Sequence, residues 1–137
     1  MLHQLLAEVD VAEVDALPGR QLFAMVGEER APVLVLPPDA VAAYLSYLLV
    51  GRPLVLKLAG KEPATPAESS APVTQEVAAD PVRTRLLLAQ HSSRGVTPLN
   101  GALPGAAELA GANAVIVVPP SDVPIPAHGD VICWLLD

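Results

Sequence analysis

The hydrophobic positions in the first half of the chain predict a short helix followed by two strands. Residues 2–9 carry leucine and valine at helical spacing, which indicates a helix with one buried face. Residues 21–26 and 32–36 are mostly apolar and are separated by the polar tip 27–30. The run Val-Leu-Val-Leu in the second segment has no polar alternation, and this is typical of a strand covered on both faces in an α/β sheet.

A second helix is expected from Ala40 to about residue 50. Asp39 follows two prolines that end the preceding strand, and its carboxylate can accept hydrogen bonds from the first backbone N–H groups of a helix. Pro53, next to Arg52 and Gly51, should break or kink the helix because proline lacks a backbone N–H. Residues 54–58 should add one or two further helical turns, which Gly60 is expected to end. Strand, turn and helix in this order predict an α/β fragment over residues 1–60.

The second half reads as a small, mostly β domain over residues 73–137. Residues 61–72 contain three prolines among small and polar side chains and predict a linker. After it, three strands and one short Ala-rich helix are expected, at residues 82–88, 113–118 and 131–136 and at residues 106–110. Each unit has about 60 residues, a size at which a domain alone is only marginally stable. Each unit is therefore expected to pack against another unit or a partner.

The proline-rich segment 119–130 lies between the last two predicted strands. It contains four prolines and a His-Gly-Asp turn, which predict a loop. Val123 and Ile125 are expected to anchor this loop to the domain.

Composition and charge narrow the classes of partner. Hydrophobic residues make up 52% of the chain and charged residues 17%, so the chain should fold. The net charge is −7 and the 8 basic residues are scattered, which disfavours nucleic acid and anionic membranes as partners. The single cysteine, Cys133, excludes an internal disulfide and a CxxC pair and favours a cytoplasmic setting. Residues 41–59 are interrupted by Arg52-Pro53 and Lys57 and form a poor membrane span.

Three segments carry a resemblance to a known family. The sequence ALPGRQLFAMVGEERAPVLVLPPDAVAAYLSYLLVGRPLVLKLAG resembles the part of MoeA-type molybdopterin molybdotransferases, gephyrin included, where a Pro-Gly-Lys-Pro turn precedes a strand and a Pro-Gly-Asn-Pro motif opens a helix. ELAGANAVIVVPP and VPIPAHGDVICWLLD are similar to the closing β domain of the family. The resemblance covers residues 11–137 and implies the C-terminal part of such a protein.

What the resemblance implies about activity is limited by what the chain contains. Family members insert molybdenum into adenylylated molybdopterin, using an α/β domain within a homodimer. The upstream segment of that domain, with a Gly-Gly-Thr/Ser motif and several acidic active-site residues, has no counterpart here. We therefore expect no catalytic residue and no metal site in this chain.

The motifs that remain are altered at their ligand-binding positions. Pro18-Gly19-Arg20-Gln21 replaces Pro-Gly-Lys-Pro, which exchanges an ammonium for a guanidinium. Pro37-Pro38-Asp39-Ala40 replaces Pro-Gly-Asn-Pro, which removes a backbone N–H and adds a negative charge. Leu103-Pro104 stands at the place of a Ser-Gly pair.

The resemblance leaves four candidate ligand-binding residues: Gly19, Arg20, Pro37 and Arg83. Arg94 could be a third arginine of the same anion pocket. The alternative for the arginines is an ordinary solvated surface. The alternative for Pro37 to Ala40 is a purely structural turn, although a strand-to-helix junction can offer backbone N–H groups to a phosphate.

Other groupings have a functional and a structural interpretation, and the structural one is favoured for each. An acidic run could hold a metal but is more often a solvated face, and it comprises Glu8, Asp10, Glu13 and Asp15. His91 with Ser92 and Ser93, or His128 with Asp130, could pair a base with a nucleophile, but no supporting third group is visible. Cys133 lies in a predicted strand and should be buried.

These observations predict a noncatalytic or auxiliary protein of molybdenum cofactor biosynthesis. It would hold no cofactor tightly and could bind molybdopterin or adenylylated molybdopterin, with molybdate and magnesium if it were active. A homodimer or another cofactor-biosynthesis protein is the expected partner, because open sheet edges need cover. The alternatives are one half of a split molybdotransferase and an assembly module without any cofactor link.

Overall fold

The computed structural model describes residues 11–17, 19–26, 31–62, 66–99 and 105–136. For residues 11–26, 105 and 106 the description is of the backbone. The predicted helix at residues 2–9 and the Leu103-Pro104 pair lie outside the described residues.

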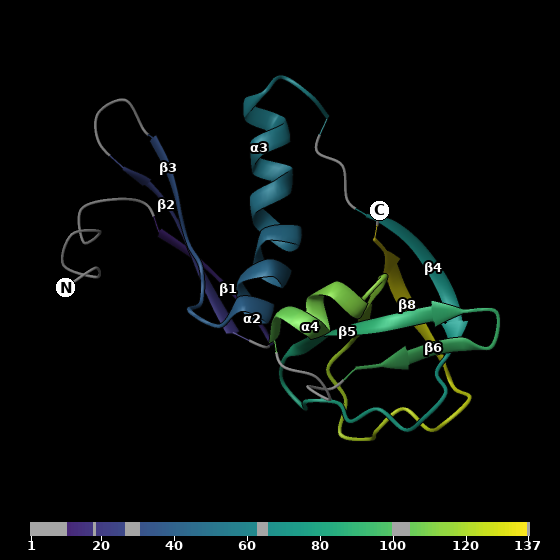
Figure 1. The fold of residues 1–137 in the computed structure, drawn as a ribbon. Helices are drawn as coiled ribbons and strands as arrows, with labels where there is room; N and C mark the ends of the chain where they lie inside the picture. The colour runs from purple at the N-terminus through teal and green to yellow at the C-terminus, as the bar shows by residue number, and fades with distance from the viewer. Residues whose placement is uncertain (1–10, 18, 27–30, 63–65, 100–104, 137) are drawn as a thin grey trace.

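One sheet of eight strands runs through the described residues (Figure 1), in the order β3-β2-β1-β5-β7-β8-β4 with β6 on β5. The strands are β1 (Val11–Leu17), β2 (Gly19–Val26), β3 (Ala31–Val35), β4 (Ala67–Pro72), β5 (Thr84–Ser92), β6 (Gly95–Pro98), β7 (Ala114–Val118) and β8 (Asp130–Leu135). All pairs are antiparallel except β1 with β5. That parallel pair joins the N-terminal strands to the C-terminal half.

The N-terminal strands form a β1-β2-β3 meander. The two predicted strands are confirmed as β2 and β3. The expectation that the second of them is covered on both faces is wrong, because β3 is half-buried from Pro32 to Val35 and exposed at Ala31. β3 ends the order of the described sheet and pairs only with β2, which explains the incomplete cover.

The helical segments expected before and after Pro53 form one continuous helix, without the break expected at the proline. It consists of α2 (Ala40–Ser46), the π-helical turn η1 (Tyr47–Gly51) and α3 (Arg52–Leu58). A wider turn tolerates a missing N–H, because the backbone bonds around it are already rearranged. By length and apolarity alone this helix could also cross a membrane, a test that core helices of soluble proteins pass as well.

Both predicted ends of the helix are confirmed. The carboxylate of Asp39 accepts a hydrogen bond from the backbone N–H of Ala42 at 2.8 Å, which is an N-cap. Gly60 has a φ of +76°, and its N–H donates to the carbonyl of Lys57 at 3.0 Å. This left-handed conformation favours glycine and ends the helix.

The C-terminal residues form the expected small β domain. β5, β7, β8 and α4 (Gly105–Gly111) correspond to the predicted elements. The linker prediction is wrong for residues 67–72, which form β4 and pair with β8 from Ala67 opposite Leu135 to Pro72 opposite Asp130. Small side chains gave this strand no apolar pattern, and its proline lies at the strand end, where a missing donor is tolerated.

The strands of this domain curve into a half-barrel, seen in Figure 1 as β4 and β8 bending towards β5 and β6. An isolated bridge between Val73 and Val96 brings the chain after β4 against β6. Beside it, the hydroxyls of Thr74 and Thr97 lie 2.8 Å apart within hydrogen-bonding distance. The loop predicted between β7 and β8 is observed, and one of its two expected anchor residues is confirmed. Ile125 exchanges two 2.9 Å backbone hydrogen bonds with Val77, whereas Val123 is exposed.

Two hydrophobic cores lie on opposite faces of the β5-β7-β8 sheet. The first fills the half-barrel, and its fully buried members are Val73, Val77, Ala89, Val96, Ala114, Ile116, Val118 and Cys133. The second lies between the long helix and the sheet and combines Leu45 and Leu48 of the helix with Leu86, Leu88 and Val115 of the strands. The helix of the first unit and the strands of the second unit therefore share one hydrophobic core.

Asn113 fastens the start of β7 to β5. Its side-chain oxygen accepts from the N–H of His91 at 2.6 Å, and its side-chain nitrogen donates to the carbonyl of His91 at 3.1 Å. Its backbone N–H donates to Ala89, and its carbonyl accepts from Leu136. Asn113 therefore fixes the position of β7 against β5, and we call this its strand-lock role.

Asn113→Ala should lower the free energy of unfolding by about 1–3 kcal/mol, because two backbone groups of β5 lose their side-chain partner. Urea denaturation measures this. Gln90→Ala removes one hydrogen bond, from the Gln90 side chain to the Gly111 carbonyl, and is the matched control with a smaller expected loss. Equal stability of the Asn113 variant and wild type would contradict the strand-lock role.

Candidate functional site

Strand pairing brings Arg20 and Arg83 to the same end of the sheet. Arg20 lies opposite Asp15 in the β1-β2 pair. Ala16 lies opposite Thr84 in the parallel β1-β5 pair, so Arg83 comes level with Asp15 one residue earlier on both strands. The two arginines are thus two strands apart, roughly 10 Å between backbones.

Gly19 and Pro37 lie at this end as well. Gly19 opens β2 opposite Ala16. The last β2-β3 pair joins Leu22 to Val35, so Pro37 follows two residues later, level with the start of β2. All four candidate residues therefore come together, although they are up to 64 positions apart in the sequence. We call this region the junction edge, comprising Asp15, Gly19, Arg20, Pro37, Pro38, Asp39, Asp80 and Arg83.

The strand-to-helix segment of the junction edge has little capacity for an anion. Pro37 is half-buried and Pro38 is exposed, and neither has a backbone N–H to donate. The carboxylate of Asp39 already accepts the N–H of Ala42. A phosphate approaching the first turn of the helix would therefore meet a negative charge and one occupied donor.

Asp80 organises the turn that precedes β5. One oxygen of its carboxylate accepts from the N–H groups of Val82 at 2.9 Å and Arg83 at 2.8 Å. These two hydrogen bonds, and to a smaller degree the charges of Arg83 and Arg85, hold the pKa of Asp80 below its ordinary value of 3.8. The guanidinium of Arg85 also donates to the carbonyl of Ala78.

Asp80→Asn should lower stability at neutral pH. A depressed carboxylate pKa contributes stability above the unfolded-state value of 3.8, and this contribution is lost as the pH falls through the folded-state pKa. Urea midpoints of variant and wild type should therefore differ at pH 7 and converge well below pH 3.8. Asp122→Asn, in the exposed 119–125 loop, is the control. A gap that persists unchanged in acid would contradict this assignment.

The charges of the junction edge nearly balance. Its positively charged residues are Arg20 and Arg83, and its negatively charged residues are Asp15, Asp39 and Asp80. Two arginines and three aspartates give this set a formal charge of −1, which offers no net attraction to a phosphate-bearing ligand.

Arg94 does not join the other arginines, which corrects that expectation. It lies in the turn between β5 and β6, and its N–H donates to the hydroxyl of Ser92 at 3.2 Å. Arg83 precedes the first residue of β5, so the two arginines are on the order of 25 Å apart along the strand. The sequence alone does not show which of the arginines lie close together, because this depends on how the strands pair.

The histidine and serine groupings take up structural positions. His91 is held through its backbone by Asn113, and the hydroxyl of Ser92 donates to the carbonyl of Gly95 at 3.4 Å in the same turn. His128 adopts a left-handed φ of 69°, and its N–H donates to Val73 at 2.7 Å. In the described part of the chain no three metal-binding side chains gather.

Cys133 is fully buried, as expected. Burial raises the pKa of its thiol, because the thiolate would lose its hydration. It lies in the core of the half-barrel rather than in a cleft.

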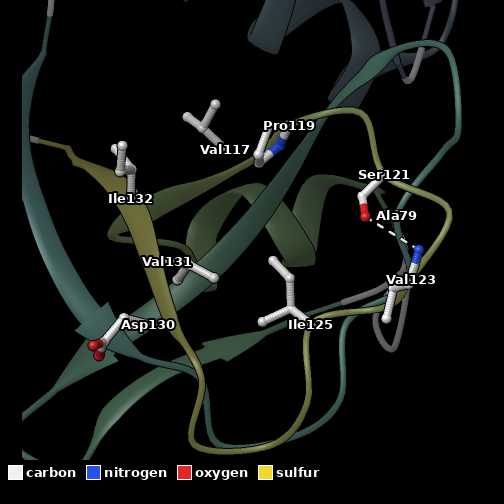
Figure 2. A pocket seen from close by; sticks show the side chains of 9 residues that line it. All are labelled: Ala79, Val117, Pro119, Ser121, Val123, Ile125, Asp130, Val131 and Ile132. Carbon is white, nitrogen blue, oxygen red and sulfur yellow. Dashed lines mark hydrogen bonds between the residues drawn. The ribbon is translucent and has the colours of Figure 1, made fainter.

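An apolar hollow of about 440 Å³ lies beside β7 and β8 (Figure 2). Its wall includes Val117, Val123, Ile125 and Ile132, and no lysine, arginine or histidine lines it. The hydroxyl of Ser121 accepts the N–H of Val123 at 3.1 Å. The hollow is therefore unsuited to a phosphate. It adjoins the junction edge, because the backbone N–H of Ser121 in its wall donates to the carbonyl of Asp80 at 2.9 Å.

Asp80 was not singled out in the sequence. Its signal is Asp80-Pro81 before an apolar strand, since aspartate before proline often initiates a turn in which the carboxylate accepts nearby N–H groups.

The sequence is similar to that of a known protein of molybdopterin metabolism. No family model matches the chain. Molybdopterin molybdenumtransferase 1 of Mycobacterium tuberculosis, in strains CDC 1551 and H37Rv alike, is 31% identical over 125 residues, which covers 83% of this chain and 29% of the relative.

Solved structures share the fold. The molybdopterin biosynthesis MoeA protein of Pyrococcus horikoshii superposes with a TM-score of 0.81 at 18% identity, over 99% of this chain and 34% of that one. A molybdenum cofactor biosynthesis protein of Pyrococcus furiosus gives a TM-score of 0.66 at 20% identity, over 90% of this chain and 45% of that one.

The chain spans about a third of the length of the molybdenumtransferase and MoeA relatives that it matches. The sequence match covers most of the chain, and the fold match extends over nearly all of it. The chain is a relative of MoeA-type molybdopterin molybdenumtransferases and corresponds to their C-terminal part.

Proposed function

We propose that this chain is a noncatalytic relative of the molybdenumtransferases that acts in molybdenum cofactor biosynthesis by weak pterin binding or by supporting a partner. In this proposal residues 1–60 derive from the α/β molybdopterin-binding unit and the C-terminal residues from the closing β domain. The observation that carries it is the junction edge, where the strand register brings the candidate residues to one end of the sheet while the Asp39 carboxylate caps the helix and Pro38 has no N–H to donate.

The retained framework supports a relation to the cofactor pathway. Asn113 locks β7 to β5, and the helix and sheet share a core. These features maintain the arrangement of the two units, which would serve recognition of a partner protein as well as a ligand. The expected partners are a second copy of the chain or another cofactor-biosynthesis protein, in the cytoplasm.

The altered groups support weak binding without catalysis. Pro38 cannot donate an N–H to a phosphate, and Asp39 places a carboxylate where the family motif has an amide. Gly19, Arg20, Pro37 and Arg83 remain as the ligand-binding positions. If the protein acted within a larger assembly, molybdate and magnesium would enter with the adenylylated pterin as substrates and ions of the reaction.

A motif-restoring variant tests this proposal. Pro38→Gly combined with Asp39→Asn supplies an N–H, removes a negative charge and keeps an N-cap residue. Calorimetry with adenylylated molybdopterin should show roughly thirtyfold tighter binding by this variant than by wild type, since each of the two changes contributes on the order of 1 kcal/mol.

The controls separate ligand binding from general effects. Arg83→Gln should weaken binding further, whereas Arg94→Gln, at the far end of β5, should leave it unchanged. Tight binding by wild type, or an unchanged affinity of the restored variant, would contradict the account.

The fold match over 99% of the chain also fits a second candidate, one half of a split molybdotransferase. Mixing the chain with a separate protein that carries the upstream acidic motifs should then restore molybdenum insertion. Failure of such a mixture, with both proteins folded, removes this candidate and leaves the first intact.

A further inference from the structure

A second cavity lies where the long helix meets the end of the chain. It measures about 280 Å³ and is lined by Tyr44, Tyr47, Leu48, Arg52 and Leu136. The chain has two tyrosines, and both line this cavity. It lies apart from the apolar hollow beside β7 and β8, with which it shares no lining residue.

The π-helical turn is what brings the aromatic and basic groups together. In an α-helix, residues five apart point about 140° away from each other around the axis. Here the N–H of Arg52 donates to the carbonyl of Tyr47, a bond across five residues that stacks these two positions on one side. Single π-helical turns of this kind are frequent at functional sites.

Gly51 fixes the position of the Tyr47 ring. A methyl group at Gly51 would lie 2.8 Å from Cδ2 of Tyr47 and 3.3 Å from Cδ2 of Leu34. The ring therefore packs directly on the glycine, and the side chain of Leu34 in β3 lies close to the same glycine. Tyr47 is still 40% exposed, so the ring also presents a surface to the cavity.

The far wall of the cavity belongs to the C-terminal half. The N–H of Leu136 donates to the carbonyl of Asn113 at 2.9 Å, which holds the end of the chain beside the helix. A ligand in this cavity would contact both halves of the protein and stabilise their packing by binding the folded state alone.

We propose that this cavity binds a small planar ring carrying one carboxylate. Aromatic faces stack on a planar ring. The guanidinium of Arg52 can pair with a carboxylate through two parallel hydrogen bonds, and with five N–H groups it serves more than one acceptor. The volume is at the lower end of ligand pockets, which fits one or two rings. This site is distinct from the junction edge and does not depend on pterin binding there.

Tyrosine ring signals provide a direct test. In full-length protein labelled with carbon-13 at the tyrosine ring, two ring environments are expected, and both face the cavity. Benzoate should shift both in a saturable way, with an affinity in the roughly millimolar range for a one-ring ligand. Benzamide has the same shape without the charge and should bind roughly tenfold more weakly or worse.

Two variants and a control complete the test. Arg52→Gln should reduce benzoate affinity at least tenfold, and Gly51→Ala should reduce it by displacing the Tyr47 ring. Arg94→Gln should bind as wild type does. Absence of any shift in wild type, or equal binding of benzoate and benzamide, or unchanged affinity in a folded Arg52→Gln variant, would each overturn the proposal.

Discussion

Gly95→Ala is expected to lower the free energy of unfolding by about 2–5 kcal/mol. Gly95 is buried at the start of β6 and has a φ of +121°, a conformation that side chains rarely adopt. A methyl group there would overlap the backbone carbonyl oxygen of Pro72 at the end of β4. The backbone of a paired strand can move aside only at a large cost in free energy. The substitution would therefore separate β6 from the end of β4, where the half-barrel closes.

Gly60→Ala is the matched control for this prediction. Gly60 also has a positive φ, of +76°, but nothing lies within 4 Å of the position of an added methyl group. The expected loss is about 1 kcal/mol, the cost of the left-handed conformation alone. Urea denaturation of both variants separates the two contributions. Equal losses would show that the contact with Pro72 does not constrain the fold.

Leu45→Ala is expected to destabilise the whole chain by about 2–5 kcal/mol. Leu45 is 1% exposed and lies in the core shared by the helix and the β5-β7 sheet. Truncation removes apolar burial and leaves a cavity between the two units. Because the units share this core, fluorescence of Trp134 and circular dichroism should report one common transition.

Val55→Ala is the control for Leu45. Val55 lies on the same long helix but is 56% exposed, so its loss should stay within about 0.5 kcal/mol. A double variant of Leu45 and Leu88 should show a coupling energy of about 0.5–3 kcal/mol, as expected for neighbours in one core. Additive losses, or two separate transitions, would contradict a shared core.

The elements that the sequence predicts well are those with a strong apolar pattern. β7 and β8 contain runs of Val, Ile and Leu, and both contribute buried residues to the half-barrel. Asp39 and Gly60 predict the helix ends because the chemistry of a cap is local.

The missed elements lack such a local pattern. β4 consists of Ala, Glu, Ser and Pro, and it is defined by its pairing with β8, whose residues lie 58 to 68 positions later in the sequence. β1 carries Glu13 and Asp15, which favoured a solvated face, and β6 has only four residues. Pairing with distant strands decides these segments, and that information is not local in the sequence.

The candidate site shows the same division. The resemblance selected Gly19, Arg20, Pro37 and Arg83 one by one, and only the strand register shows that they share one end of the sheet. The same register excludes Arg94. The tyrosine cavity had no signal in the sequence, because a π-helical turn rather than α-helical spacing brings Tyr47 to Arg52.

We propose that this chain keeps the framework of the molybdenumtransferases without their chemistry. The most direct test incubates the purified chain with adenylylated molybdopterin, molybdate and magnesium and measures molybdenum bound to the pterin by elemental mass spectrometry. We predict no insertion above the level of a protein-free control. Molybdenum insertion that requires the chain, and that is lost in an Arg83→Gln variant, would contradict the claim.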